Sequence, residues 1–472
     1  MQTIAAYAKL KLLRARSEAR YAIRKESWSA LNTIVAKFGG TSLAGTGQFQ
    51  KVKAIISENP ARRIIVASAP GKRFPEDTKV TDLLLRCFET ASRGEDFEGD
   101  LDAVFDRFRD IVRGLGMDFP LDEERDALRE RLRSAPERNY VLSRGEYLNS
   151  LILADYLGFT FVDPEWCVCF DPDGRLDAPM TRRTLGAALK PLENAVVAGF
   201  YGADMDGRIH TFSRGGSDVT GSLAAAAVGA DLYENWTDVS GLLAADPHIV
   251  PSPRTVKYVS YRELRTLSYM GASVLHTDAV MPVAGMNIPI NIRNTDSPAD
   301  AGTTIVRKLP KGETKHPIIG VAGRVGMSVI QVEKLMVSDE SGFTAVMLDI
   351  LKNRRIPFEQ CLTGIDTVTV IIRSDVLAPY REALFDEIRE KLDPDYLGLT
   401  ERLSMIAVIG EKGTDTCDAN VRVLQALSNV GMPISTINQC AGKLNLLIGV
   451  PEERYEEAIR AIYATIDEVE GD

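Results

Sequence analysis

The stretch Thr33–Ser42 reads Thr-Ile-Val-Ala-Lys-Phe-Gly-Gly-Thr-Ser, and it predicts both an architecture and a kind of site. Its apolar, β-branched first half fits a short buried strand, which runs into Lys37 and is followed by Gly39 and Gly40. Glycine lets the backbone approach a ligand closely, so that N–H groups can point at anionic oxygens, and Lys37 adds a mobile positive charge. A strand, a lysine and a glycine turn in this order are typical of a phosphoryl-transfer site. A solvated lysine before an ordinary turn is the alternative.

Size and composition exclude several classes of protein. The chain has 472 residues, of which 45% are hydrophobic and 26% charged, as in a soluble globular protein of about two to four domains. Its net charge of −10 argues against nucleic acid or an anionic membrane as the main partner. No apolar run approaches the roughly 20 residues of a membrane helix. Six cysteines without paired spacing indicate a reducing compartment, and we expect a cytoplasmic protein.

We expect no metal site held by the protein alone. Cys167 and Cys169 form an isolated Cys-x-Cys, which alternating positions of a strand explain better than a metal, and the four histidines are scattered. Residues 1–32 form a basic N-terminal extension without the continuous apolar core of a secretory signal. A frayed basic helix or an upstream-extended start is favoured there over an Arg-rich transit peptide.

From residue 33 to about 307, short apolar runs alternate with longer amphipathic stretches. This alternation predicts an α/β domain, a three-layer sandwich with a mostly parallel central sheet covered by helices on both faces. In such sheets ligands bind beyond the carboxyl ends of the strands, where the glycine-rich segments of this chain fall. The expected strands are 64–68, 195–200, 232–236 and 288–293, and the expected helices are 48–57, 80–90, 101–114, 123–134, 145–157, 218–229 and 260–270.

A polar linker over 308–316 precedes a duplicated pattern. The order strand, helix, strand, strand, helix occurs over 318–397 and again over 398–472, which is an internal repeat with a period of about 75 residues. The second unit lacks a final strand, which residues 318–323 could supply by pairing with it. Small βαββαβ sandwiches without catalytic-looking residues favour a pair of regulatory binding modules.

A second glycine-rich segment suggests the opposite wall of the site. Gly215-Gly216-Ser217 leads into an Ala-rich helix whose first turn carries Asp218. A glycine loop at a helix N-terminus offers free N–H groups and a partial positive charge, and Arg214 can hold a carboxylate or phosphate with two donors. Asp218 could act as a base or orient the lysine, and capping of its helix is the alternative.

Two further segments carry polar residues at expected element ends. Thr237 and Asp238 follow an expected strand and suit hydrogen bonds to a ribose or base, with an ordinary Asx turn as the alternative. In Ser143-Arg-Gly-Glu146, the glutamate is expected in the first turn of a helix, where it either binds a substrate ammonium or complements the helix dipole. The chain contains neither a P-loop motif nor a protein-kinase HRD and DFG set.

Together these segments resemble the aspartokinases, which phosphorylate the β-carboxylate of L-aspartate. The matching runs keep their order and spacing from about 33 to 307, and the duplicated tail resembles the paired ACT domains of that family. The resemblance implies an amino-acid kinase fold over 33–307 followed by two βαββαβ ACT-type regulatory modules. The runs are Lys37–Ser42, Val66–Gly71, Val80–Leu83, Ser143–Glu146, Arg214–Asp218, Trp236–Val239, Ala245–Pro247 and Gly271–His276.

The resemblance also implies an activity and residue roles. The activity is ATP- and Mg²⁺-dependent formation of 4-phospho-L-aspartate, the first step toward lysine, threonine and methionine. Lys37 would stabilise charge on the transferred phosphoryl group, and Asp218 would organise the catalytic groups. Aspartate contacts are implied for Thr41, Ser68, Thr81, Glu146 (ammonium), Arg214 (carboxylate), Gly215 and Ser217. Nucleotide contacts are implied for Lys37, Gly39, Gly40, Gly216, Thr237, Asp238, Leu243, His248, Ser273 and Val274.

Some positions depart from the family's usual pattern. Leu243, His248 and Ser273 replace a common tyrosine, arginine and lysine, all on the presumed nucleotide side. The paired modules imply a homodimer or higher homo-oligomer inhibited by an end product, lysine first and threonine second. Gln439 and Asn445 are the candidate effector contacts, within a run that also departs from the usual one.

Two other functions stay open from the sequence. One is a related amino-acid kinase that acts on another acidic substrate such as glutamate. The other is a non-catalytic amino-acid sensor with a decayed kinase domain. The presence of Lys37 and Asp218 favours an enzyme.

Overall fold

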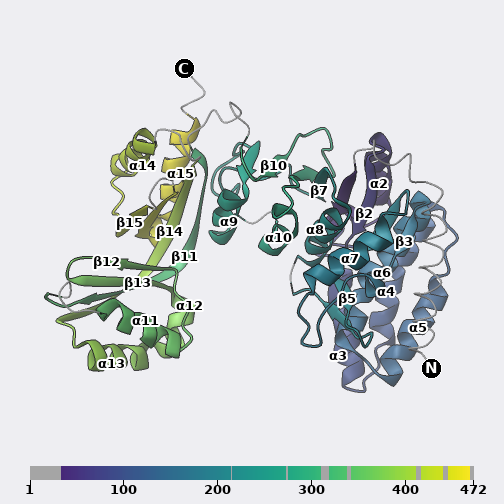
Figure 1. The fold of residues 1–472 in the computed structure, drawn as a ribbon, viewed down its shortest axis with the longest axis horizontal. Coiled ribbons are helices and arrows are strands. Elements are labelled where there is room, and N and C mark those ends of the chain that lie inside the picture. The colour runs from purple at the N-terminus through teal and green to yellow at the C-terminus, as the bar shows by residue number, and fades with distance from the viewer. Residues whose placement is uncertain are drawn as a thin grey trace. The chain divides into compact units, whose positions relative to one another are not determined.

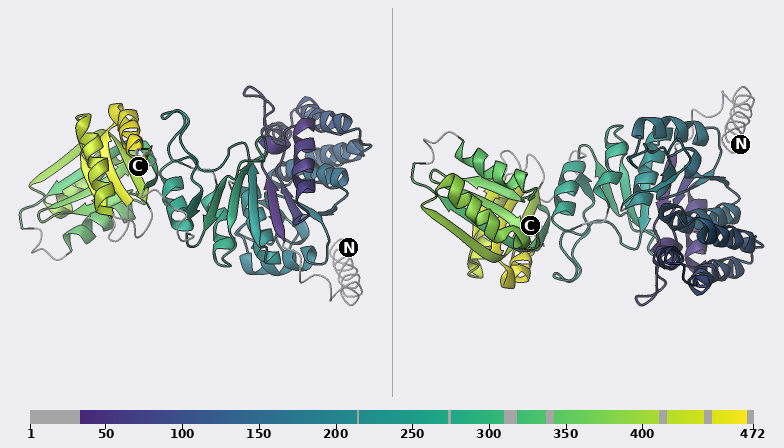
Figure 2. Two further views of the ribbon diagram at one scale, coloured as in Figure 1. Left: turned by 90° about the horizontal axis from the view of Figure 1, so that it is seen from above. Right: turned by 90° about the horizontal axis from the view of Figure 1, so that it is seen from below.

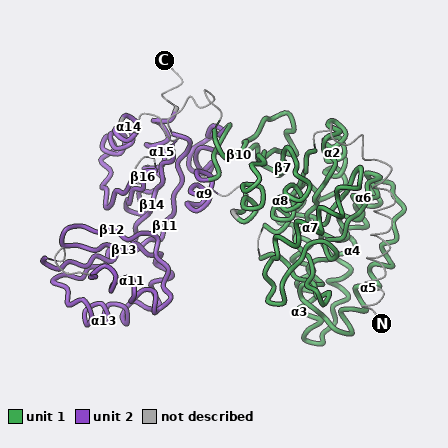
Figure 3. Tube along the Cα trace, in the orientation of Figure 1, with its two compact units in different colours: residues 1–242, 257–261, 274–309 green, residues 243–256, 262–273, 310–472 purple. Residues whose placement is uncertain are grey.

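The computed structural model describes residues 33–213, 215–272, 275–309, 318–336, 342–410, 416–439 and 445–467. The predictions for residues 1–32, Arg214, Ser273 and Val274 lie outside the described residues. The chain forms two compact units (Figure 3). Among the described helices, none is both long and apolar enough to cross a membrane. The first unit comprises Met1–Leu242, Lys257–Tyr261 and Val274–Leu309, and the second Leu243–Val256, Arg262–Ser273 and Pro310–Asp472.

An eight-stranded sheet with the order β3-β4-β2-β1-β7-β9-β10-β8 forms the middle of the first unit (Figure 1). All neighbouring strands run parallel except β9 and β10, so the prediction of a mostly parallel sheet is confirmed. The strand β1, Ile34–Phe38, is buried at every position, as a central parallel strand requires. The other strands are β2 (Arg62–Ala67), β3 (Thr160–Val162), β4 (Ala195–Ala198), β7 (Leu232–Thr237), β8 (Tyr258–Ser260), β9 (Ile290–Asn294) and β10 (Thr303–Val306), while β5 (Tyr201–Ala203) and β6 (Ile209–Thr211) form a separate hairpin.

Helices cover both faces of this sheet, as the sequence predicts (Figures 1 and 2). Successive residues of a strand face opposite sides. Ala36 and Phe38 therefore join the apolar core under α2 to α6, whereas Lys37 faces α8 on the other side. The helices are α2 (Thr46–Glu58), α3 (Val80–Ser92), α4 (Glu98–Leu115), α5 (Leu121–Ser134), α6 (Arg138–Leu157), α7 (Ala178–Leu189), α8 (Gly216–Val228), α9 (Tyr261–Tyr269) and α10 (Met281–Ala284).

Helix α6 begins earlier than the sequence predicts. It was expected from residue 145, but it begins at Arg138, so that Glu146 lies well inside the helix and not in its first turn. Gly145 has another purpose, because a Cβ there would lie 3.0 Å from the Cβ of Ala69 and 3.2 Å from Cδ1 of Leu84. Close packing, not a helix start, explains the glycine. The interpretation of Glu146 as a helix-dipole partner is therefore wrong, since that effect is confined to the first turn.

The second unit contains a six-stranded antiparallel sheet with the order β12-β13-β11-β14-β16-β15. Two long strands, β11 (Ile318–Glu333) and β14 (Tyr396–Gly410), run through it. Residues 318–324 of β11 pair with 405–410 of β14, whereas residues 329–333 of β11 pair with 396–400 of β14. Each βαββαβ module thus contains one half of each long strand, and the expected pair of ACT-type folds is confirmed.

The remaining elements of the second unit complete these two modules. In the first are α11 (Phe343–Asn353), β12 (Gln360–Thr363), β13 (Thr367–Arg373), α12 (Ser374–Leu377) and α13 (Arg381–Leu392), and in the second α14 (Thr416–Asn429), β15 (Thr436–Gln439), β16 (Asn445–Pro451) and α15 (Tyr455–Asp467).

Candidate active site

The carboxyl ends of β1, β2, β4 and β7 meet at one edge of the first sheet, because these neighbouring strands are parallel. Gly39 and Gly40 follow β1, Ser68 follows β2, Phe200 lies just past β4, and Asp238 follows β7. The topology therefore brings segments far apart in the sequence to the edge at which ligands bind in open α/β sheets.

A buried ion pair joins the two predicted walls of the site. Nζ of Lys37 lies 2.5 Å from Oδ1 of Asp218, and Lys37 is only 8% exposed. The side chain of Asn235 completes the group, because its Nδ2 donates to Oδ1 of Asp218 at 3.0 Å and its Oδ1 accepts from Nζ of Lys37 at 3.4 Å. The Tyr233 hydroxyl also donates to the Asp218 carbonyl at 3.0 Å. The interpretation of Lys37 as a solvated lysine is wrong.

Asp218 does not cap its helix, which was the alternative. Helix α8 begins at Gly216 with Gly215 as its N-cap, and the Asp218 carboxylate is directed at Lys37. Gly215 adopts φ of 60°, which favours glycine, and a Cβ at Gly216 would lie 2.7 Å from Cδ2 of Phe200. The start of α8 is therefore packed tightly against the end of β4.

Phe200 itself has φ of 79°, an uncommon conformation for a bulky residue. Its backbone N–H donates to the Thr220 hydroxyl at 3.2 Å, which helps to hold it. Ser217 is buried and packs against the residue before Phe200. A Cβ at that residue, Gly199, would lie 2.4 Å from Oγ of Ser217. Strained backbone of this kind is found where the surrounding structure fixes a functional geometry.

The first glycine turn is built by close contact with the loop after β2. A Cβ at Gly40 would lie 3.0 Å from the Ala69 carbonyl oxygen, and the Gly71 amide donates to the Gly40 carbonyl at 2.8 Å. The Gly39 amide already donates to the Trp236 carbonyl at 2.9 Å. The amide of Gly39 is therefore not free to bind a ligand. The missing side chain of Gly39 leaves space beside Lys37, since a Cβ on Gly39 would lie 3.5 Å from Nζ of Lys37. Thr41 begins the short 3₁₀ turn Thr41–Leu43 that follows.

Glu146 is a buried carboxyl group without a charged partner among the residues that the structure describes. It is 6% exposed, and among the described residues its Oε2 has no hydrogen-bond partner. Burial raises the pKa of Glu146 to about 8, although a hydrogen bond from the Ala69 backbone opposes this shift. The nearby Asn149 side chain donates to the Ser68 carbonyl at 2.6 Å. An unpaired buried acceptor of this kind is suited to a cationic ligand group.

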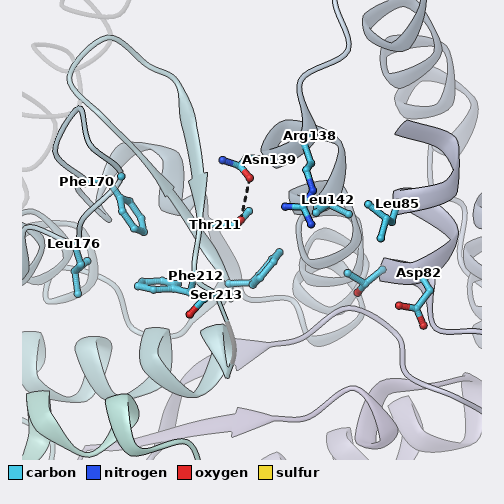
Figure 4. Close-up of a pocket in the computed structure, with 13 residues that line it drawn as sticks. Asp82, Leu85, Arg138, Asn139, Leu142, Phe170, Leu176, Thr211, Phe212 and Ser213 are labelled. Atoms are coloured by element: carbon cyan, nitrogen blue, oxygen red, sulfur yellow. Dashed lines mark hydrogen bonds between the residues drawn. The ribbon is translucent and has the colours of Figure 1, made fainter. Parts of the chain in front are cut away.

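A cavity of 630 Å³ opens in the first unit (Figure 4). It brings Thr81 of α3 together with Ser213, which immediately precedes Arg214. Figure 4 shows Arg138 and Asn139 facing it from α6, where Oδ1 of Asn139 accepts from the Thr211 hydroxyl at 3.1 Å. The remaining lining residues are Asp82, Leu85, Leu142, Phe170, Gly174, Leu176, Phe200, Thr211 and Phe212.

Other predicted residues are placed without a contact that assigns a role. The Thr237 hydroxyl donates to Oδ1 of Asp238 at 3.1 Å on the surface. Leu243 and His248 belong to the second unit. Gln439 is exposed and accepts from Asn420 at 2.9 Å, and Asn445 is the first residue of β16. Their nucleotide and effector contacts stay predictions.

Sequence reasoning missed Asn235, although a signal was present. Lys37 and Asn235 are direct partners in the register between β1 and β7. Polar residues at matched positions of two buried neighbouring strands are unusual, because a parallel sheet is otherwise apolar on both faces. That coincidence could have identified the pair.

Comparisons with known proteins identify the family to which this chain belongs. Residues 32–294 match the amino acid kinase family. Aspartokinase 3 of Bacillus subtilis is 34% identical over 444 residues, which are 91% of this chain and 97% of that protein. The chain belongs to the aspartokinase family. The resemblance read from the motifs is thus confirmed.

Two further aspartokinases extend the comparison along nearly the whole chain. The structure of the aspartate kinase from Clostridium acetobutylicum has a TM-score of 0.83 and 38% identity, and the match covers 92% of this chain and 100% of that one. The lysine-sensitive aspartokinase 3 of Escherichia coli is 25% identical over 460 residues, which are 92% of this chain and 99% of that protein.

Proposed function

We propose that this chain transfers the γ-phosphoryl group of ATP to the β-carboxylate of L-aspartate, giving ADP and 4-phospho-L-aspartate. The observation that carries the proposal is the buried Lys37 ammonium, held at 2.5 Å by Asp218 between two glycine loops. The reaction brings two anions together, and a fixed positive charge at the transferred phosphoryl group offsets their repulsion. Lys37 supplies that charge.

Asp218 acts in this proposal as the group that orients Lys37. The acceptor is a carboxylate with an ordinary pKa near 4, so it is already ionised at neutral pH and has no proton to lose. A carboxylate oxygen attacks the γ-phosphorus in line, and the bond to the β,γ-bridging oxygen breaks as ADP leaves. No general base is needed, so the contact of Asp218 with Lys37 is sufficient reason for its presence.

Glu146 takes the ammonium of aspartate in this proposal, because its Oε2 is buried and has no partner in the described part of the chain. Arg214 takes a carboxylate, and Thr81 lines the adjoining cavity. Further contacts to aspartate come from Thr41, Ser68, Gly215 and Ser217. The nucleotide lies against Gly39, Gly40 and Gly216, with Thr237, Asp238, Leu243, His248, Ser273 and Val274 as additional contacts carried over from the family.

Mg²⁺ enters with the nucleotide in this proposal. In the described parts of the chain, no three His, Cys, Asp or Glu side chains come together as a metal site. Mg²⁺ is commonly held by one or two carboxylates together with substrate phosphates. A site without a cluster of three protein ligands is therefore compatible with Mg²⁺. When bound, the ion neutralises charge on the phosphate oxygens.

The experiment is an ADP-release assay on the purified chain with ATP, Mg²⁺ and L-aspartate. We expect aspartate-dependent turnover, and a fall in kcat of about a hundredfold or more for Lys37→Ala, because a preorganised charge at the phosphoryl group is lost. Lys51→Ala is the matched control, since this lysine lies on α2 with its side chain 53% exposed. No aspartate-dependent turnover, or equal rates for Lys37→Ala and wild type, would overturn the proposal.

The same assay separates the alternatives. A related kinase would turn over L-glutamate faster than L-aspartate, whereas we expect L-aspartate to be preferred. A non-catalytic sensor would release no ADP with either amino acid. The Lys37–Asp218 pair favours an enzyme, because a decayed active site has no reason to retain a buried ion pair.

We also propose feedback inhibition by an end product, with lysine tested before threonine, in a homo-oligomer joined through the ACT-type modules. The support is the paired antiparallel modules and the similarity to a lysine-sensitive aspartokinase. Inhibition curves with each amino acid and molar mass by light scattering test this. Unchanged activity with both effectors would refute the regulation, and a monomer at assay concentrations would refute the assembly.

We place this activity in the cytoplasm. The four cysteines whose side chains the structure describes are free, which fits a reducing compartment. Cell fractionation with antibody detection tests the location.

A further inference from the structure

Two loops carry proposed contacts to the phosphoryl donor, ATP, and to the phosphoryl acceptor, aspartate. These two loops are in close contact with each other. The glycine loop, residues 39–45, follows β1, and the acceptor loop, residues 68–79, follows β2 and leads into Thr81. The Gly71 amide donates to the Gly40 carbonyl at 2.8 Å, and a Cβ at Gly71 would lie 2.5 Å from the Gly40 carbonyl carbon. A shift of one loop therefore shifts the other.

One buried side chain from outside the site contacts both loops. Arg107 lies on α4 and is 5% exposed. Its Nη2 donates to the Gly71 carbonyl at 2.8 Å and to the Ala44 carbonyl at 3.3 Å. Its Nη1 donates to the Thr78 carbonyl at 2.9 Å. Arg107 thus connects the end of the glycine loop with two points of the acceptor loop.

Asp77 of the acceptor loop supplies the counter-charge. Oδ2 of Asp77 lies 3.0 Å from Nη1 of Arg107, and it also accepts from the backbone N–H and Nε of Arg73 at 2.9 Å each. The hydrogen bonds from Arg73, together with the charge of Arg107, hold the pKa of Asp77 well below its usual range, so its carboxylate is ionised. Burial lowers the pKa of Arg107, yet a guanidinium stays protonated in proteins.

The geometry calls for arginine and not only for a positive charge. The guanidinium serves three carbonyls and one carboxylate at the same time, in directions fixed by its planar fork. A lysine ammonium has three donors around a single nitrogen and cannot span these acceptors. A methionine of similar length would leave the three carbonyls without these donors, and Asp77 would keep its contacts with Arg73 but lose the one with Arg107.

We infer that Arg107 is a positioning residue, which holds the glycine loop in register with the acceptor loop so that the phosphoryl donor and the attacking carboxylate are aligned. The inference rests on the proposed function for the identity of the reaction. In-line transfer depends on the distance and angle between the two reactants, and a displacement of about 1 Å can cost a hundredfold in rate. Arg107 acts on this alignment without a contact to substrate.

The kinetic test compares Arg107→Lys and Arg107→Met with wild type. We expect kcat to fall about ten- to hundredfold, with the KM values for ATP and aspartate changed less than threefold, because alignment is lost while the binding groups remain. Asp77→Asn combined with Arg107→Lys should lower kcat by less than the product of the two single losses, since the two residues share one contact. Equal kcat in folded Arg107→Met, or a fall in kcat that matches the loss of folded protein, would overturn the inference.

A second measurement does not depend on activity. Hydrogen exchange of the backbone amides should speed up in both loops, 39–45 and 68–79, in Arg107→Met. Arg125→Met is the matched control, because Arg125 is a largely buried arginine that pairs with Glu98 and Asp102 and not with either loop. Faster exchange in only one loop, or equally in the control, would refute the link. If wild type shows no aspartate-dependent turnover, the proposed function fails while this measurement still decides whether Arg107 holds the two loops.

Discussion

A buried carboxyl group that binds a cation couples binding to proton release, and Glu146 has this role in the proposed function. With its pKa raised to about 8 by burial, Glu146 is mostly neutral at pH 7 while its site is empty. To pair with the ammonium of aspartate it has to lose its proton. The cost of that step falls as the pH rises toward the pKa and disappears above it.

We therefore predict that the KM for aspartate falls as the pH rises from 6 to 8, by up to about tenfold per unit, and then levels off. Glu146→Gln should raise this KM at least about tenfold and remove the pH slope, because an amide exchanges no proton in this range. Steady-state kinetics across the pH range measure both effects. Glu130→Gln, an exposed glutamate on α5, serves as the control. A slope that persists in Glu146→Gln would contradict the assignment.

The same residue predicts a change in stability. The pKa of Glu146 is higher in the folded chain, about 8, than its ordinary value of 4.5, so the native state binds more protons in that window. Stability should accordingly fall as the pH rises from 4.5 to 8, with Glu146 contributing at most about 5 kcal/mol of that fall. Urea unfolding of wild type and Glu146→Gln at pH 5 and 8.5 tests this. Parallel losses in the two proteins would contradict it.

At the scale of elements, the site depends on how closely the loop after β1 approaches the loop after β2. Gly71→Ala should reduce kcat at least about tenfold, because the new Cβ would lie 2.5 Å from the Gly40 carbonyl carbon and force the glycine turn to move. Gly47→Ala on α2 is the matched control, since a Cβ there meets nothing within 4 Å, and it should keep its activity. Wild-type kinetics in Gly71→Ala would show that the turn tolerates displacement.

The sequence predicts elements better than it predicts contacts between them. Lys37, Gly40 and Asp218 could be identified because strand, turn and helix signals surround them, and the paired modules because their element order repeats. The start of α6 was predicted wrongly because glycine is common at helix boundaries. In the structure, Gly145 lies inside the helix, where it allows close packing against Ala69. Arg107 could not be identified from the sequence, since its partners lie in two loops 29 to 63 residues away.

At the scale of the whole molecule, the two compact units are interleaved along the sequence. Residues 243–256 and 262–273 precede the expected boundary at 307, yet they pack with the C-terminal part. The Val321 amide donates to the Ala244 carbonyl at 2.8 Å, and the Arg254 amide donates to the Tyr463 hydroxyl at 2.9 Å. The division between a catalytic domain at 33–307 and regulatory units at 318–397 and 398–472 stays a prediction.

A chain that ends after Leu309 should therefore be less soluble and less stable than the full chain. Truncation would expose Ile249, Val256 and Leu267, which are buried in the second unit. Light scattering and thermal unfolding of the fragment measure the effect. Adding residues 310–472 as a separate polypeptide should restore solubility, and a fragment that is monodisperse with the full chain's Tm would contradict the prediction.

The long strand β11 has a consequence for synthesis on the ribosome. Its first half, Ile318–Gly323, is almost entirely buried, and its ladder partners are residues near the end of β14. Those residues are translated 83 to 92 positions later, which is roughly 4 to 18 s at about 5–20 residues per second. During that interval the apolar first half of β11 has no ladder partner from β14, and unpaired strand edges promote aggregation. Nascent chains stalled between the two strands should accordingly be the ones that chaperones bind most strongly.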